Sequence, residues 1–240
     1  MSEDGTNALA VIPARGGSKR IPRKNIRLFL GVPLIARTIA VLQNSGVFAR
    51  IVVSTDDEDV AAIATAAGAE VPFRRPADLA TDTATTLPVI AHAVGALEAL
   101  GWRGSFVCCA YPAAVLSRPE DYQAAMKLMA APSPADYVFT ATSFPAPIQR
   151  AFRRNADGGT EMFWPEHRDT RSQDLEPAFH DAGQFYLGRR DAWVNGRPIF
   201  SAASRMLELP RYRVQDIDTE EDWLRAELLF RILQEDGRTN

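Results

Sequence analysis

Residues 9–25 have the sequence LAVIPARGGSKRIPRKN, in which a short apolar run leads directly into a glycine-containing basic loop. The apolar run, Leu9–Pro13, predicts a buried first strand of an α/β sheet. Glycines at the end of such a strand let the backbone approach an anion closely and present its N–H groups. Arginine and lysine side chains then neutralise the charge that builds up as a pyrophosphate leaves. The stretch therefore predicts a triphosphate-binding loop at the edge of a sheet.

Two common phosphate-binding motifs are excluded by the spacing of this loop. The P-loop places a glycine directly before its lysine, whereas Lys19 follows Ser18 here. The dinucleotide fingerprint G-x-G-x-x-G is also absent. A solvated basic loop without a ligand is the alternative explanation for four of the cations, which are Lys19, Arg20, Arg23 and Arg27. Arg15 and Lys24 favour a binding role, because both stand where the loop meets ordered structure.

Composition and charge narrow the class of protein. The chain has 240 residues, an apolar content of 46% and a net charge of −3, which fits one globular domain over residues 1–240. We expect no nucleic-acid binding without a basic excess, and no membrane span without a longer apolar run. Residues 1–7 contain no basic segment followed by an apolar one, so we expect no secretory signal and a cytoplasmic location. Cys108 and Cys109 are neighbours on a strand and face opposite sides, which predicts buried, reduced thiols.

Strands and helices alternate from Leu9 to Ala141. Short apolar or β-branched runs predict strands at Leu9–Pro13, Arg50–Ser54, Phe106–Cys109 and Val138–Ala141. Helical spacing and helix-start signals predict helices at Pro33–Ser45, from Asp56 to Ala67, at Thr85–Leu100 and at Pro119–Ala130. This βαβ order predicts a mainly parallel sheet covered by helices on both faces, with the ligand at the carboxyl ends of the strands.

The pattern changes between residues 143 and 183. Four prolines and the pair Gly158-Gly159 break any long helix there, so we expect an irregular insertion. Downstream, strands are predicted at Gln184–Leu187 and Tyr212–Ile217, followed by a closing amphipathic helix at Thr219–Leu233.

Asp216 and Asp218 form the second informative feature. Two aspartates one residue apart at a strand end can point the same way and bind a hard cation through oxygen ligands. Mg²⁺ favours one or two carboxylates together with phosphate oxygens, which suits nucleotidyl transfer. The alternative for Asp218 is a capping role, because Asp218 and Glu221 have the spacing of a capping box before the last helix.

The basic loop resembles the signature of a known family. Its P-A-R…P-x-K-N string, residues 13–25, is similar to the N-terminal motif of cytidylyltransferases that activate nonulosonic and related sugar acids. The similarity extends from about Ala8 to Leu233. It implies a three-layer α/β/α Rossmann-like nucleotidyltransferase fold of the nucleotide-diphospho-sugar transferase type, with residues 143–183 as an extended dimerisation arm. It also implies a homodimer that transfers CMP from CTP to a nine-carbon acidic sugar, with Mg²⁺ as cofactor and pyrophosphate as second product.

The resemblance assigns roles to individual residues. Arg15 is expected to grip the triphosphate, and Lys24 to balance charge on the leaving pyrophosphate or to orient the attacking hydroxyl. Asp216 and Asp218 match the metal-binding aspartates of the family, and Asp218 is therefore counted with Arg15 and Lys24 as catalytic. Further nucleotide contacts are implied for Ala14, Gly16, Gly17, Ser18 and Asn25.

A second match covers residues 75–82, which have the family pattern R-P-x-x-L-A-x-D. By this resemblance Arg75 helps to recognise the cytosine nucleotide, whereas Arg74 is a solvated neighbour. Asp82 ends the match and either contacts the nucleotide or is only the N-cap of the helix that begins near Thr85.

Three strings bear on the acceptor sugar. Residues 144–150, 170–174 and 179–186 are most similar to family members that act on pseudaminic acid, and sialic or legionaminic acid is the alternative. Arg150 or Arg171 is expected to bind the sugar carboxylate as a planar fork. Hydroxyl or acylamino groups are expected to contact Gln173, Asp181 and Gln184, although a structural hydrogen bond is the alternative for any single one of them.

The loop at residues 110–115, AYPAAV, departs from the family, where a small hydroxyl residue followed by proline is usual. Lost hydroxyl contacts would weaken substrate binding or alter selectivity. The alternative to an enzyme is therefore a non-catalytic module that binds CTP or a CMP-sugar. Because Arg15, Lys24, Asp216 and Asp218 are all present, we favour an active enzyme.

Overall fold

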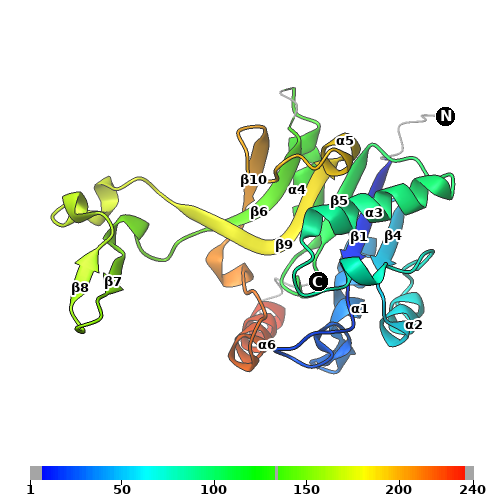
Figure 1. Cartoon of the computed structure of the whole chain (residues 1–240), viewed down its shortest axis with the longest axis horizontal. Helices are drawn as coiled ribbons and strands as arrows, with labels where there is room; N and C mark the ends of the chain where they lie inside the picture. Colours follow the sequence, from blue (N-terminus) through cyan, green and yellow to red (C-terminus); the bar gives the residue numbers. More distant parts are fainter. Residues whose placement is uncertain (1–6, 133–134, 236–240) are drawn as a thin grey trace.

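The structure is a computed structural model that describes residues 7–132 and 135–235. Within these residues the chain forms one six-stranded sheet in the order β10-β6-β9-β5-β1-β4 (Figure 1). The strands are β1 (Ala8–Pro13), β4 (Arg50–Ser54), β5 (Phe106–Ala110), β6 (Tyr137–Ser143), β9 (Phe179–Arg189) and β10 (Ser204–Glu208). The expectation about a secretory signal concerns residues 1–7, of which all but the last lie outside the described residues.

Most neighbouring strands run parallel, as the sequence predicts. β1 pairs in parallel with β4 and β5, so that Leu9 lies between Arg50 and Val107, and β6 pairs in parallel with β10. β9 is antiparallel to both of its neighbours, β5 and β6. The pairing of β6 with β9 shifts register between Phe139 and Ala141, which marks a bulge between Asp181 and Tyr186 in β9.

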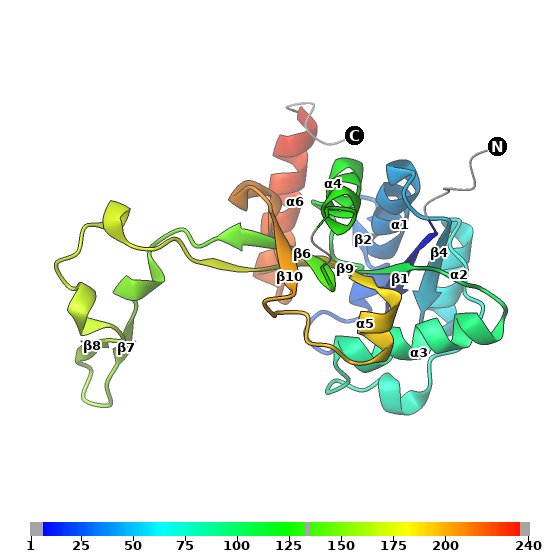
Figure 2. The same ribbon diagram turned by 90° about the horizontal axis from the view of Figure 1, so that it is seen from above.

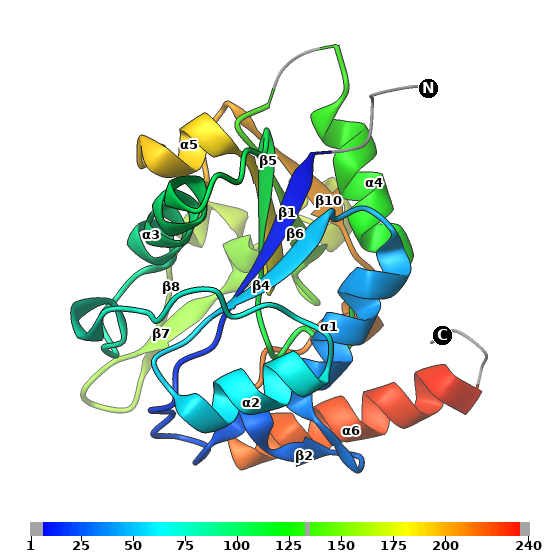
Figure 3. The same cartoon turned by 90° about the vertical axis from the view of Figure 1, so that its right-hand side faces the viewer.

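Helices cover both faces of the sheet (Figure 3). One face carries α1 (Leu34–Ser45), α2 (Glu58–Ala66) and α4 (Pro119–Met129), and the other carries α3 (Thr86–Ala99) and α5 (Arg190–Val194). Cys108 packs in the core between the sheet and α1, α2 and α4, and Cys109 packs in the core on the opposite face. Both thiols are free and fully buried, which confirms the prediction of buried, reduced thiols.

The closing helix, α6 (Glu220–Glu235), packs on a separate apolar cluster. Phe29 belongs to this cluster and lies in a short hairpin of β2 (Leu28–Phe29) and β3 (Val32–Pro33). The five predicted helices are confirmed, with ends that differ by at most two residues. None of the helices that the structure describes is long and apolar enough to cross a membrane.

The predicted strand at Tyr212–Ile217 is wrong. The chain forms a 3-10 turn at Arg211–Arg213 and then continues without sheet pairing to Asp218. Arg213 is buried, and its guanidinium donates to both oxygens of Asp121 at 2.8–3.1 Å, which ties this segment to α4 instead of the sheet. The strand at the β6 edge of the sheet is instead β10. Its sequence, Ser-Arg-Met-Leu-Glu, contains no β-branched residue, so its pattern did not predict a strand.

The insertion between β6 and β9 leaves the body of the molecule as an extended arm (Figures 1 and 2). It contains a hairpin of β7 (Phe152–Arg154) and β8 (Thr160–Met162) and three short 3-10 turns, Ile148–Arg150, Pro165–His167 and Ser172–Asp174. Phe152 and Phe163 are 65% and 54% exposed there. The arm is therefore more ordered than an irregular insertion, and it holds large apolar side chains outside the three cores.

Candidate active site

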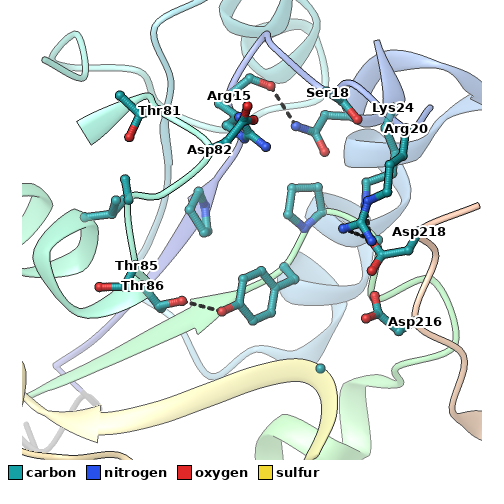
Figure 4. A pocket seen from close by; sticks show the side chains of 18 of the residues that line it. Arg15, Ser18, Arg20, Lys24, Thr81, Asp82, Thr85, Thr86, Asp216 and Asp218 are labelled. Carbon is teal, nitrogen blue, oxygen red and sulfur yellow. Dashed lines mark hydrogen bonds and ion pairs between the residues drawn. The ribbon is translucent and has the colours of Figure 1, made fainter. Parts of the chain in front are cut away.

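A cavity of about 620 Å³ opens at the carboxyl ends of β1 and β5, where the sequence predicts the ligand (Figure 4). The basic loop, the segment before α3, the loop after β5, the start of β9 and the chain before α6 all contribute to its wall. The charged side chains that line it are Arg15, Lys19, Arg20, Lys24, Arg75, Asp82, Asp181, Asp216 and Asp218. Four separate regions of sequence thus bring predicted site residues together in one pocket.

The basic loop is anchored at both of its ends. At the start, Ala14 is buried, and its N–H donates to the Ser54 carbonyl of β4 at 3.0 Å. At the end, the buried Asn25 donates from Nδ2 to the Arg15 carbonyl at 2.9 Å. The loop therefore curls back on itself, and Ser18 and Asn25 line the pocket while Ala14 lies behind it.

Gly16 is required where the loop passes the start of α2. A Cβ at this position would lie 2.4 Å from Oδ2 of Asp57, the residue that caps α2. The Gly16 N–H donates to Oδ1 of Asp56 at 3.1 Å. A Cβ at Gly17 would meet nothing within 4 Å. Neither glycine lines the pocket, so their side of the loop serves to shape it.

Lys24 and the two predicted metal ligands meet on one side of the pocket (Figure 4). Lys24 Nζ donates to the Ile217 carbonyl at 2.6 Å and lies 3.5 Å from Oδ1 of Asp218. Arg20 pairs with the same oxygen at 2.8 Å. Desolvation in the pocket, and after it the neighbouring Asp218 carboxylate, raise the pKa of Asp216. A cation would relieve that repulsion, and two carboxylates are hard oxygen donors, so the pair fits Mg²⁺.

The capping box of α6 lies one residue further along than expected. Asp222 Oδ2 accepts from the Thr219 N–H at 2.9 Å, and Thr219 Oγ1 accepts from the Asp222 N–H at 3.2 Å. The alternative of a capping box at Asp218 and Glu221 is therefore wrong. The Asp218 carboxylate faces the loop cations instead.

Asp82 bridges two cations of the basic loop. Arg15 Nη1 donates to its Oδ1, and Lys19 Nζ pairs with its Oδ2. Lys19 first, and then Arg15, hold the pKa of Asp82 below its usual range. The N-cap of α3 is Thr85, so the alternative of Asp82 as the N-cap is wrong.

Arg75 is buried beneath the pocket and is 5% exposed. Its Nε donates to Ser54 Oγ at 3.1 Å and its Nη2 to the Ser54 carbonyl, while burial lowers the pKa of the guanidinium. Arg74 is exposed and pairs with Glu58, as expected of a solvated neighbour. Arg75 thus brings a fixed planar group to a wall of the pocket.

Two tyrosines that the sequence analysis did not assign to the site also line the pocket. The Tyr111 hydroxyl at the end of β5 is hydrogen-bonded to Thr86 Oγ1 at 2.5 Å, and its ring packs edge-on against Tyr186 at 5.6 Å between centroids. Tyr186 donates to Oδ2 of Asp181, and the Gly183 N–H donates to Oδ1 at 3.0 Å. The only sequence signals were an aromatic residue just after one predicted strand and another within a second, and they gain meaning once β9 is known to lie beside β5.

The loop that departs from the family, residues 110–115, is held firmly at the mouth of the pocket. Thr38 Oγ1 donates to the Pro112 carbonyl at 2.9 Å, and Ser117 Oγ donates to the Ala114 carbonyl at 2.6 Å. Because Tyr111 begins this loop, the pocket has a tyrosine hydroxyl at the place where the sequence lacks a serine or threonine.

The predicted sugar-binding residues are divided between two places. Asp181 lines the pocket. Gln184 is buried behind it, with Nε2 donating to the Arg213 carbonyl at 2.6 Å and Oε1 lacking a hydrogen-bond partner among the described residues. Gln184 is therefore a structural residue in this chain, and the prediction that it contacts the sugar directly has no support from its position.

The other three predicted sugar-binding residues lie in the arm. Arg150 donates to the Thr170 carbonyl, Arg171 pairs with Asp174 at 2.7 Å, and Gln173 is exposed. None of the three is among the residues that line the pocket in the described chain. Because the arm points away from the sheet (Figure 2), a single chain does not bring them to Asp181.

A family model described as cytidylyltransferase matches residues 9–146, which include β1 from its second residue, the basic loop, Arg75 and the whole of β5. The chain belongs to the cytidylyltransferase family. This cytidylyltransferase is 42% identical over 227 residues to the pseudaminic acid cytidylyltransferase of Campylobacter jejuni, covering 95% of this chain and 97% of that protein. It is 31% identical to the CMP-N,N'-diacetyllegionaminic acid synthase of Legionella pneumophila, with the same two coverages of 95% and 97%.

Solved structures of other proteins share the fold of this cytidylyltransferase. A CMP:2-keto-3-deoxy-manno-octonic acid synthetase complexed with CTP has a TM-score of 0.69 at 17% identity, covering 95% of this chain and 99% of that one. The 4-diphosphocytidyl-2C-methyl-D-erythritol synthase of Anaerococcus prevotii has a TM-score of 0.62 at 13% identity, covering 95% and 100%. The predicted three-layer nucleotidyltransferase fold is confirmed.

Proposed function

We propose that this cytidylyltransferase transfers CMP from CTP to pseudaminic acid and releases pyrophosphate. The observation that carries the acceptor is the 42% identity, over 95% of this chain, with the pseudaminic acid cytidylyltransferase of C. jejuni. Legionaminic or sialic acid is the runner-up, since the legionaminic acid relative is 31% identical over the same share of the chain. CTP as the donor is supported by the pocket, in which the basic loop faces Asp216 and Asp218.

In the proposed reaction the anomeric hydroxyl oxygen of the sugar acid attacks the α-phosphorus of CTP. The bond between that phosphorus and the bridging oxygen breaks, pyrophosphate leaves, and the hydroxyl proton passes to water. Arg15 and Lys24 hold the triphosphate and stabilise the charge that grows on the leaving group. Lys24 is suited to this role because its hydrogen bond to the Ile217 carbonyl already fixes its ammonium group.

We propose Asp216 and Asp218 as the residues that hold Mg²⁺. Both line the pocket, and the desolvation and mutual repulsion that raise the pKa of Asp216 are what a divalent cation relieves. When bound, Mg²⁺ neutralises phosphate charge and polarises the α-phosphate. The nucleoside is proposed to contact Ser18, Asn25 and Arg75, with Ala14, Gly16 and Gly17 shaping the loop behind them.

We further propose a homodimer that acts in the cytoplasm, where CTP is available. The arm carries exposed Phe152, Phe163 and Trp164, which a second subunit would cover. Arg150 and Arg171 also lie in the arm, so contact with an acceptor requires the partner's pocket. Light scattering on the wild type and on a Phe152→Ser/Phe163→Ser variant tests this. We expect a dimer that the double change dissociates, and a monomeric wild type would contradict the proposal.

The acceptor is tested by competition. The purified enzyme is given CTP, Mg²⁺ and equal amounts of pseudaminic, legionaminic and sialic acid, and the CMP-sugars are identified by mass spectrometry. We expect CMP-pseudaminate to dominate. Predominant formation of either other CMP-sugar would keep the reaction and overturn the acceptor.

A further inference from the structure

Asp82 occupies the cationic wall of the pocket in the way an anionic ligand would. It lies in the segment between the 3-10 turn Ala77–Leu79 and α3, on the opposite side of the pocket from Asp218 (Figure 4). Each of its oxygens engages a different cation, Oδ1 with Arg15 and Oδ2 with Lys19. A carboxylate or a phosphate that meets two cations through two oxygens satisfies them in the same manner.

The four cations of the basic loop that line the pocket are each already paired with a carboxylate. Arg15 and Lys19 face Asp82, whereas Arg20 and Lys24 face Asp218. A polyphosphate that uses Arg15 and Lys19 must therefore first separate them from Asp82. The binding free energy that results is the difference between the phosphate contacts and the contacts with Asp82.

The fold gives Asp82 no other task that would explain its place. It does not cap α3, whose N-cap is Thr85. Its side chain makes no hydrogen bond or ion pair within residues 7–132 and 135–235 other than those with the two cations. Lys19 and Arg15 keep it ionised, because they hold its pKa below the usual range. The position of Asp82 is thus determined by the same groups that the ligand needs.

We propose that Asp82 is an affinity-setting residue that competes with the phosphates of CTP, and of the leaving pyrophosphate, for Arg15 and Lys19. This inference rests on the proposed function only because it takes CTP as the ligand. Asp82 lowers the affinity of the pocket for CTP, and it re-forms its ion pairs as pyrophosphate departs. The Asp82 carboxylate therefore lowers the affinity for CTP and, by the same competition, speeds the release of pyrophosphate.

The test replaces Asp82 with asparagine, which keeps the shape and removes the charge. Asp78→Asn is the matched control, because it removes one carboxylate from the neighbouring 3-10 turn, outside the pocket lining. Binding of CTP and of inorganic pyrophosphate is measured by titration calorimetry with EDTA present, so that no metal contact enters. We expect Asp82→Asn to bind both ligands about three- to tenfold more tightly, the effect of releasing two exposed ion pairs. Asp78→Asn should bind them as the wild type does.

Unchanged or weaker binding of CTP by Asp82→Asn would overturn the proposal, as would equal tightening in the Asp78→Asn control. A second variant keeps the test independent of one substitution. Lys19→Met should weaken CTP binding more in the Asp82→Asn background than in the wild type, because the competitor is then absent. An equal effect in both backgrounds would count against competition at Lys19. No acceptor sugar is present in these measurements, so a wrong acceptor leaves the outcome unaffected. A wild type that binds no CTP when Mg²⁺ replaces the EDTA would refute the proposed function.

Discussion

Replacing Lys24 with methionine separates two contributions that the structure assigns to one ammonium group. The side chain is 20% exposed, its Nζ donates to the Ile217 carbonyl at 2.6 Å, and it faces Asp218 at 3.5 Å. Methionine preserves the apolar stem and removes both interactions. Lys24→Met should therefore lower the stability of the fold and, separately, the rate of CMP transfer.

The size of each effect follows from these contacts. A hydrogen bond from a charged donor to a buried carbonyl contributes about 1.5–3 kcal/mol, so the free energy of unfolding should fall by about that amount. For a chain of this size the fall corresponds to a decrease in Tm of roughly 3–12 °C. Loss of a preorganised cation that stabilises the leaving group should lower kcat by about 100-fold or more.

Arg20→Met is the matched control, because Arg20 contacts the same carboxylate oxygen but its side chain is 68% exposed. An exposed pair of this kind contributes about 1 kcal/mol at most, so its Tm should stay close to that of the wild type. Differential scanning fluorimetry and steady-state pyrophosphate release measure the two effects. A Lys24→Met enzyme with the wild-type Tm would refute the structural part of the reasoning. A lower Tm with an unchanged kcat would refute the catalytic part.

Two further predictions concern the metal ligands and the loop. The pKa of Asp216 is raised, so ionisation of this carboxyl opposes folding as pH rises through that pKa. Asp216→Asn should therefore raise the Tm of the metal-free protein at pH 7. The same change should abolish Mg²⁺-dependent turnover. The gain in Tm should disappear as the pH is lowered and the wild-type carboxyl is protonated, and an equal or lower Tm at pH 7 would contradict this. Gly16→Ala should lower Tm and weaken CTP binding, because the new Cβ displaces Asp57 from its cap on α2 at a cost of about 1 kcal/mol. Gly17→Ala, where a Cβ meets nothing within 4 Å, should do neither, and equal effects of the two changes would show that the loop is not held by this close approach.

The parts of the fold that local sequence determines could be predicted, and so could much of the pocket. Strand β1 and its loop follow from an apolar run and the glycines after it, and the place of Arg15 and Lys24 in the pocket follows from that loop at the carboxyl end of the strand. Asp216 was placed in the site by the family resemblance, since the strand expected before it does not form. The capping box was misplaced by one residue, because Asp222 and Glu221 are equally suited to accept backbone hydrogen bonds and only the helix start distinguishes them.

The remaining differences depend on contacts between distant residues. A strand was expected at Tyr212–Ile217, but Arg213 forms a buried ion pair with Asp121, 92 positions away in the sequence. This ion pair holds the segment away from the sheet. Tyr111 and Tyr186 meet only because β9 inserts antiparallel beside β5, which no local pattern indicates. Arg150 was expected to bind the sugar carboxylate, but it lies in the arm and is not among the residues that line the pocket in the described chain.

Pyrophosphate release from CTP tests the central claim most directly. The wild type and an Asp218→Asn variant are assayed with CTP and Mg²⁺, with pseudaminic acid and without any acceptor. We predict release by the wild type that requires pseudaminic acid and Mg²⁺ and that falls by about 100-fold or more in the variant. Release with another sugar acid alone would change the acceptor. No release with any acid, from a protein that still binds CTP, would contradict the account and favour a nucleotide-binding module.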